Sequence, residues 1–339
     1  MQDFSLYPIQ GIAREWRREQ FDLARLPIGI LPGLRIEDVS SCIAADTFKF
    51  VERDLGTRAV ETLSETHYAL VHRHDAKTTF QNGEMVQEHE YIEQSEQLVR
   101  KVAACLRLIR PMRQYSNFMR GVVRDDGKFD VRHFQTPANL IAVPEIQALF
   151  LLRDRDADDL IKFAPKFLRA MDGNFWKFRM AVQFHELGYW AQDDRWKARY
   201  LLWASAIESI YTSHNCQGSR LAKKRIRWFL GENTSIYSPE DLADTMLLDP
   251  HITVGLIADD IYKLRTFIAH GDRIPDADFN GICRRGLNGG VTLYEGLFEA
   301  QSFIIRASLL KILQADLLNH FEDADPADAY FKSHELAKP

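Results

Sequence analysis

The hydrophobic pattern of the first half of the chain has the short period of strands. Residues 31–39 (LPGLRIEDV) alternate apolar and polar side chains beside a Pro-Gly turn, and residues 65–74 (ETHYALVHRH) have the pattern of a second strand. Within residues 119–134, the pair Asp126-Gly127 stands between two alternating segments, which is typical of a hairpin turn. The pattern therefore predicts short strands joined by tight turns.

One long segment of this half has helical spacing instead. Between Met85 and Arg110 the apolar residues recur at near-helical intervals, and Pro111 ends the run. Strands together with a helix predict an α+β domain over residues 1–153.

From residue 154 onward the pattern is helical almost throughout, which predicts an all-α domain over residues 154–339. Gly173 and Gly231 each end a helical segment, and Ser238-Pro239 has the composition of a helix start. The polar tail, residues 322–339, is expected to be frayed. The predicted helices cover residues 156–173, 174–191, 193–213, 219–231, 238–248, 252–270 and 291–320, with a loop containing Gly286, Gly289 and Gly290 before the last.

Composition and charge limit the classes of function. The chain has 339 residues, enough for two domains, and its net charge of -5 gives no overall basic field for nucleic acid. A nucleic-acid contact would have to come from a local basic patch. There is no run of about 18 apolar residues and no long apolar segment at the N-terminus, so we expect no membrane span, no secretory signal and a cytoplasmic location. The cysteines lack zinc-ligand spacing and are expected to be reduced thiols: Cys42, Cys105, Cys216 and Cys283.

The helix predicted at residues 252–270 ends in a pattern that suggests chemistry. Arg265 and His270 lie near its end, and Gly271 follows as a candidate cap. At about 100° per residue, Arg265 lies about 40° from the apolar stripe and His270 about 180° from it. An ordinary helix end also carries such residues, with the arginine stem at the core edge and the histidine beside the C-terminal dipole. The stripe consists of Val254, Ile257, Ile261, Leu264 and Ile268.

Three segments together resemble the HEPN superfamily and, within it, the Apea-like group. They are AIES with Glu208, SRLAKKRIRWFLG with Arg225, and LRTFIAHG with Arg265 and His270. The likeness covers residues 155–322 well and the first half loosely. It implies an all-α HEPN-like bundle and a metal-independent endoribonuclease that acts as a homodimer, in which the Arg and His of each subunit meet across the interface. Members of this group are often associated with bacterial defence against phage.

On this resemblance Arg265 and His270 are the predicted catalytic residues, with no metal and no cofactor. Histidine titrates near neutral pH and so exchanges protons readily, while the arginine fork matches a phosphate. Glu208 is expected to orient Arg265, the alternative being an exposed helix acid. Thr266 follows the arginine where many active members carry Asn or another strongly polar residue, and it can still form a hydrogen bond.

A basic stripe lies on the helix predicted at residues 219–231. Its members share one helical face and are Arg220, Lys223, Lys224 and Arg227. The stripe either follows an RNA backbone or is the solvated face of an amphipathic helix.

Two histidine patterns suggest metal sites less strongly. His72 and His74 share one face of their strand, but spacing fixes no third ligand, which favours a surface strand with its polar residues outward. His185 lacks the second histidine of a zinc-protease helix and is expected at the edge of the core.

Three functions therefore remain open. The first is the HEPN-type endoribonuclease, with residues 1–153 choosing the target or restraining the nuclease. The second is a non-catalytic protein that dimerises and binds RNA or a nucleotide. The third is a helical scaffold with no role in nucleic-acid biology.

Overall fold

The structure, a computed structural model, combines an antiparallel sheet with a helical region, which confirms the mixed layout of α+β followed by helices. It describes residues 2–9, 23–64, 68–75, 78–81, 84–87, 89–110, 118–135, 152–190, 196–212, 218–244, 248–283 and 295–335. The chain forms two compact units. The first consists of Met1–Leu140 and Phe150–Pro165, and the second consists of Ile141–Leu149 and Lys166–Pro339. The boundary predicted at residue 153 falls just before helix α4 (Asp154–Asp172), whereas the units divide within that helix, after Pro165.

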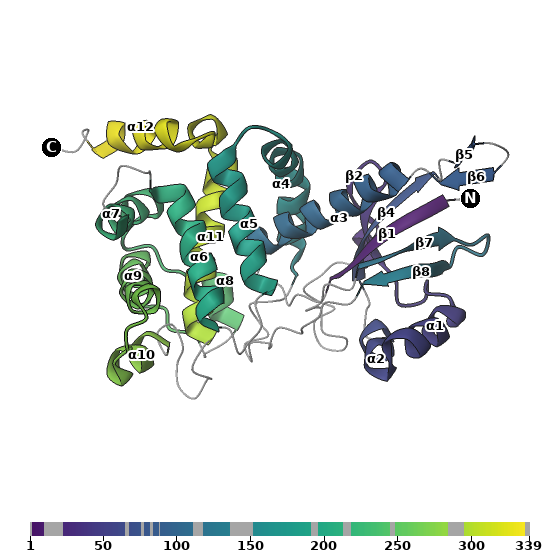
Figure 1. The fold of residues 1–339 in the computed structure, drawn as a ribbon, viewed down its shortest axis with the longest axis horizontal. Helices are drawn as coiled ribbons and strands as arrows, with labels where there is room; N and C mark the ends of the chain where they lie inside the picture. The colour runs from purple at the N-terminus through teal and green to yellow at the C-terminus, as the bar shows by residue number, and fades with distance from the viewer. Residues whose placement is uncertain are drawn as a thin grey trace. The chain divides into compact units, whose positions relative to one another are not determined.

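The first unit contains a six-stranded antiparallel sheet with the strand order β2-β3-β4-β1-β7-β8 (Figure 1). The predicted turns are confirmed: Gly33 and Gly127 take positive φ angles of 76° and 80° between paired strands. A Cβ at Gly33 would lie 2.7 Å from the Arg73 carbonyl oxygen, so this turn requires glycine also because glycine has no side chain. The strands are β1 (Gln2–Ile9), β2 (Ile28–Leu31), β3 (Leu34–Asp38), β4 (Tyr68–Asp75), β7 (Phe118–Val123) and β8 (Phe129–Gln135), with β5 (Thr78–Gln81) and β6 (Glu84–Gln87) forming a separate pair.

Helices cover both faces of this sheet. Phe4 and Leu6 of β1 pack on one face with Val51 of α1 (Ala45–Leu55) and Leu63 of α2 (Thr57–Ser64). Helix α3 (His89–Ile109) packs against β1 and β4. The prediction began this helix at Met85, but residues Glu84–Gln87 are strand β6. Because both faces are covered, β1 is buried along almost its whole length.

The α3 face of the sheet holds a polar cluster that corrects one prediction. His74 is buried rather than outward on a surface strand, and it pairs in register with Asp3. The Nδ1 atom of His72 lies 2.8 Å from the hydroxyl of Ser95 on α3, and that hydroxyl donates to Ser5 at 2.8 Å. The imidazole rings of the two histidines are 5.3 Å apart. Alternation along a strand shows which residues share a face, but it does not show that a helix covers that face.

Burial, followed by the charge of His74, lowers the pKa of His72 to about 4. An unfolded histidine titrates near pH 6.5, so between these values the unfolded chain binds more protons than the folded one. We therefore expect the first unit to lose up to about 3 kcal/mol of stability as the pH falls from 6.5 towards 4. Urea unfolding of the parent and of His72→Asn across this range measures the loss.

The asparagine variant keeps a polar group for Ser95 and removes the titration, so its stability should depend less steeply on pH. His251→Asn is the matched control, because His251 is exposed. Equal pH dependence in the parent and in His72→Asn would contradict the assignment.

The second unit is a helical assembly in which α6 packs against α5, α7, α9 and α11 (Figure 1). Helix α6 (Trp196–Tyr211) buries large side chains, among them Tyr200, Trp203 and Ile207. The other helices are α5 (Trp176–Trp190), α7 (Gly218–Leu230), α8 (Pro239–Asp244), α9 (Val254–His270), α10 (Asp276–Cys283), α11 (Glu295–Gln314) and α12 (Ala324–Glu335), with a short 3-10 turn at Leu318–Phe321.

The prediction of a frayed tail over residues 322–339 is wrong for residues 324–335. Residues Ala324–Glu335 form helix α12, whose Phe331 side chain is 0% exposed. Its ring lies 5.9 Å from that of Phe229 and 6.0 Å from that of Trp228. Ala327 and Phe331, spaced by one helical turn, provide enough apolar surface to dock an otherwise polar helix.

One further difference concerns the residues after α9. Helix α10 (Asp276–Cys283) was not predicted. The predicted glycine loop at residues 286–290, the start of the last predicted helix and the last four residues of the chain lie outside the described residues.

Candidate functional site

Helix α9 positions the candidate catalytic residues. Its predicted stripe is buried from Val254 to Leu264. The helix ends as the sequence predicts, because Gly271 takes the left-handed conformation with φ 71° and ψ 17°. The amide of Gly271 donates to the Ile268 carbonyl at 3.2 Å, and the next amide donates to the Phe267 carbonyl at 2.9 Å. This cap fixes the last turn of α9, where His270 is exposed.

Arg265 of α9 meets Glu208 of α6. The Nη2 atom of Arg265 lies 3.2 Å from Oε1 and 3.3 Å from Oε2 of the Glu208 carboxylate. The two side chains are 35% and 24% exposed, so the pair contributes at most about 1 kcal/mol to stability. Arg265 therefore keeps part of its guanidinium accessible, while the carboxylate restrains its direction.

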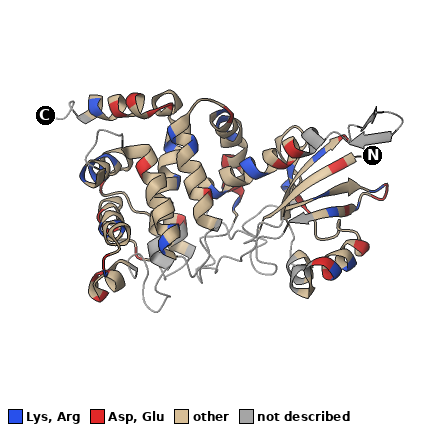
Figure 2. Cartoon of the chain, in the orientation of Figure 1, with Lys and Arg blue, Asp and Glu red and all other residues tan. Residues whose placement is uncertain are grey.

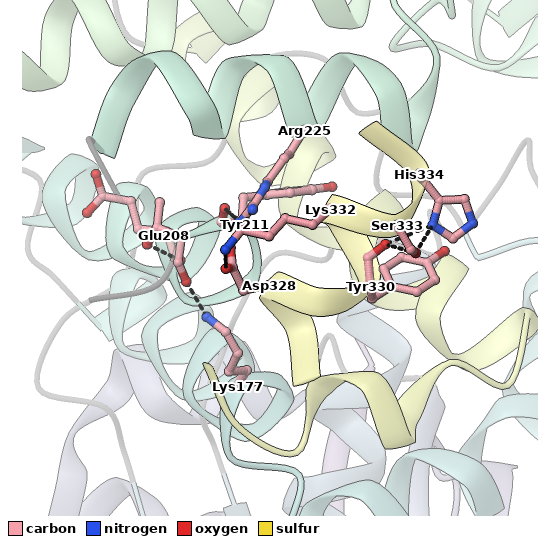
Figure 3. Close-up of polar contacts among 10 residues, drawn as sticks. Lys177, Glu208, Tyr211, Arg225, Asp328, Tyr330, Lys332, Ser333 and His334 are labelled. Atoms are coloured by element: carbon pink, nitrogen blue, oxygen red, sulfur yellow. Dashed lines mark hydrogen bonds and ion pairs between the residues drawn. The ribbon is translucent and has the colours of Figure 1, made fainter. Parts of the chain in front are cut away.

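Glu208 lies in the last turn of α6, and cationic side chains fix that end of the helix (Figure 3). Lys177 of α5 donates to the Thr212 carbonyl, and Arg225 of α7 donates to the Tyr211 carbonyl at 3.1 Å. Arg225 is 2% exposed and also forms an ion pair with Asp328 of α12. Cations at a helix C-terminus satisfy its free carbonyl groups, so two neighbouring helices, α5 and α7, hold the turn that carries Glu208, and α12 acts through Arg225.

Thr266 is turned towards its own helix. Its hydroxyl donates to the carbonyl of Tyr262, one turn earlier, at 2.8 Å. In this conformation the hydroxyl proton is occupied by the backbone. The structure therefore does not bring the Thr266 hydroxyl together with Arg265 or His270 among the described contacts.

Arg265 and His270 point in different directions from one helix. Five residues of helix separate their directions by about 140°. Arg265 faces α6, whereas His270 is exposed at the capped end. One copy of α9 therefore does not bring an imidazole and a guanidinium to the same point.

The predicted basic stripe of α7 is largely an ion-pair network with α9. Lys223 lies 3.1 Å from Asp259 of α9, and Arg227 lies 2.6 Å from the other oxygen of the same carboxylate. Arg227 is also 3.5 Å from Glu232. Figure 2 shows Lys and Arg along α7 near the acidic residues of α9.

The two remaining members of the stripe, Arg220 and Lys224, are exposed. The opposite face of α7, with Ala222, Ile226 and Phe229, is buried as predicted. The helical wheel thus identified the basic face correctly but could not show which helix packs beside it.

Tyr262 is a site residue that the sequence reasoning missed. It precedes Arg265 by three positions on α9, so the two share one side of the helix. Its side chain is 3% exposed, and its hydroxyl has no hydrogen-bond partner among the described residues. Burial, followed by the negative charge of Glu208, raises the pKa of this hydroxyl, while Arg265 opposes the rise. Spacing from Arg265 was the signal that could have identified it.

No protein-family model, curated protein or solved structure matches this chain. The resemblance to the HEPN superfamily therefore depends on the three sequence segments in α6, α7 and α9 alone. Within the part of the chain that the structure describes, no three His, Cys, Asp or Glu side chains gather as a metal site. None of the described helices has the length and apolar composition of a bilayer-spanning segment.

Proposed function

We propose that this chain is a metal-independent endoribonuclease of the HEPN class that works as a homodimer. One observation carries the proposal. Glu208 of α6 restrains the partly exposed Arg265 of α9, and α9 also presents His270 beside its glycine cap. These residues come from the segments that resemble the HEPN superfamily. A role in antiviral defence is part of the proposal, because that role is frequent in the group.

The chemistry needs two proton transfers and a cation. A ribose 2′-hydroxyl attacks the adjacent phosphorus and gives its proton to one His270. The bond between phosphorus and the 5′-oxygen breaks, and the second His270 protonates the leaving oxygen. Arg265 balances the charge that builds up on the phosphoryl oxygens. The products are a 2′,3′-cyclic phosphate and a 5′-hydroxyl.

A second subunit supplies what one α9 lacks. Because Arg265 and His270 diverge along the helix, one copy cannot place both around a single phosphate. A two-fold axis near the end of α9 would bring together two imidazoles and two guanidinium groups. One imidazole then acts as the base and the other as the acid.

RNA would approach along the exposed cations of α7. Arg220 and Lys224 are the exposed members of the stripe and can follow a phosphate backbone, and Lys223 and Arg227 are partly buried beside Asp259. We assign the backbone contacts mainly to the first two. The unit with the sheet would select the target or restrain the nuclease.

Two features favour a second candidate, a non-catalytic HEPN-type protein that dimerises and binds RNA or a nucleotide. The Thr266 hydroxyl is occupied by its own backbone, and the carboxylate of Asp259 neutralises part of the basic stripe. Such a protein would bind RNA without cutting it.

Incubation of single-stranded RNA with the purified protein in EDTA separates the two candidates. We expect cleavage that leaves 2′,3′-cyclic phosphate ends, because the attacking group is the substrate's own 2′-hydroxyl. A matched RNA with a single 2′-deoxynucleotide at the main cut should lose that cut and keep the others. Binding without cleavage would favour the second candidate, and cleavage after the 2′-deoxynucleotide would contradict the mechanism.

A further inference from the structure

A buried hydroxyl with no hydrogen-bond partner among the described residues needs an explanation. Tyr262 buries its ring and its hydroxyl between α9 and its neighbours, and phenylalanine would fill the same space without a polar group. An unsatisfied buried hydroxyl is costly, and native structures rarely keep one without a role. The role must be sought among the groups beside it.

Tyr262 lies one helical turn before Arg265 on α9, and Arg265 contacts Glu208 of α6. Glu208 and Arg265 both shift the pKa of the Tyr262 hydroxyl, in opposite directions. Tyr211, the other group that acts on it, already pairs its hydroxyl with Ser308 at 2.6 Å. The Glu208 carboxylate, which contacts Arg265, is therefore the charged acceptor on the side of α9 that carries Tyr262.

The Glu208 carboxylate has room for another donor. Two carboxylate oxygens offer about four lone-pair sites. Arg265 reaches them with one nitrogen at 3.2 and 3.3 Å, longer than a strong charge-assisted hydrogen bond. The arginine is thus restrained but not locked, and it can leave the carboxylate for a phosphate.

We propose that Tyr262 is a positioning residue: its hydroxyl donates to the Glu208 carboxylate when Arg265 turns from that carboxylate to a phosphodiester. The proposal rests on the proposed function, in which Arg265 binds phosphate. The hydroxyl then replaces the lost partner and keeps Glu208 in place. Without the Tyr262 hydroxyl, the Glu208 carboxylate would either retain its contact with Arg265 or be left without a hydrogen-bond donor near the phosphate.

A double-mutant cycle on stability tests the contact in the free protein. Arg265→Met removes the competing partner, so we expect Tyr262→Phe to lower the urea midpoint more in the Arg265→Met background than in the parent. Tyr200→Phe is the matched control, because the Tyr200 hydroxyl donates to a backbone carbonyl of α9 at Ile261. Its effect should be equal in both backgrounds. Equal shifts for Tyr262→Phe in the two backgrounds would overturn the proposal.

Binding of an uncleavable oligonucleotide, single-stranded DNA without the attacking 2′-hydroxyl, tests the link to the phosphate. With a fully 2′-deoxy oligonucleotide as the probe, Tyr262→Phe should weaken binding about five- to tenfold when Arg265 is present. In the Arg265→Met background it should change binding little, because no guanidinium leaves Glu208. An equal loss in both backgrounds would mean a purely structural tyrosine and would overturn the proposal.

The two proposals fail in different ways. If the protein neither binds nor cuts RNA, the stability cycle still decides whether Tyr262 reaches Glu208. If RNA is cut in EDTA and the cycle is additive, only the role of Tyr262 is lost.

Discussion

Asp328→Ala should lower the free energy of unfolding of the helical unit by about 3 kcal/mol. Its partner Arg225 is 2% exposed, so the variant leaves a buried guanidinium without this carboxylate. Arg225 would keep the Tyr211 carbonyl and the ring of Phe331, whose centroid lies 5.0 Å away, but neither neutralises its charge. Equilibrium unfolding in urea measures the change.

Lys332→Ala is the matched control within the same network. Lys332 lies 2.6 Å from the other Asp328 oxygen, and its side chain is 64% exposed. Removing it breaks an exposed ion pair, for which we expect at most about 1 kcal/mol. Equal losses for the two variants would show that the Arg225–Asp328 pair is not the contact that holds α12.

His270→Ala should lower the rate of RNA cleavage about 10²- to 10⁴-fold, the usual contribution of a group that transfers a proton. Because His270 is exposed after the last buried turn of α9, stability should remain unchanged. Initial rates in EDTA measure the effect. His251→Ala is the control, since it removes another exposed histidine of the same unit. Cleavage by His270→Ala at the rate of the parent would show that His270 does not transfer a proton in the reaction.

Sequence periodicity identified α9 well. Its stripe, its glycine cap and the border position of Arg265 all follow from residues close together in the chain. The partner of Arg265 does not, because Glu208 lies 57 residues earlier. Spacing cannot bring two helices together, so that contact was expected only through the resemblance.

The tail shows how composition can mislead. Residues 322–339 are mostly polar, yet Ala327 and Phe331 are enough to dock a helix of twelve residues against an aromatic cluster. The ion pair of Asp328 with Arg225 strengthens the docking. Arg225, named from sequence only within the segment that resembles the HEPN superfamily, is thus a buried link between α12 and the end of α6.

The sequence also did not predict which neighbouring helix packs over a given face of a helix or sheet. The α7 stripe was placed on the correct side, but Asp259 of α9 packs beside it and pairs with Lys223. In the sheet, α3 covers the face that carries His74. Both cases depend on a neighbour that is distant in the chain.

The central claim is that two subunits pool His270 and Arg265 around one phosphate. The most direct measurement mixes the parent with His270→Ala at constant total protein, with subunit exchange or co-expression, and follows cleavage in EDTA. A mixed dimer lacks either the acid or the base, so the rate should fall as the square of the parent fraction. A linear fall would show that each subunit cuts alone and would contradict the account.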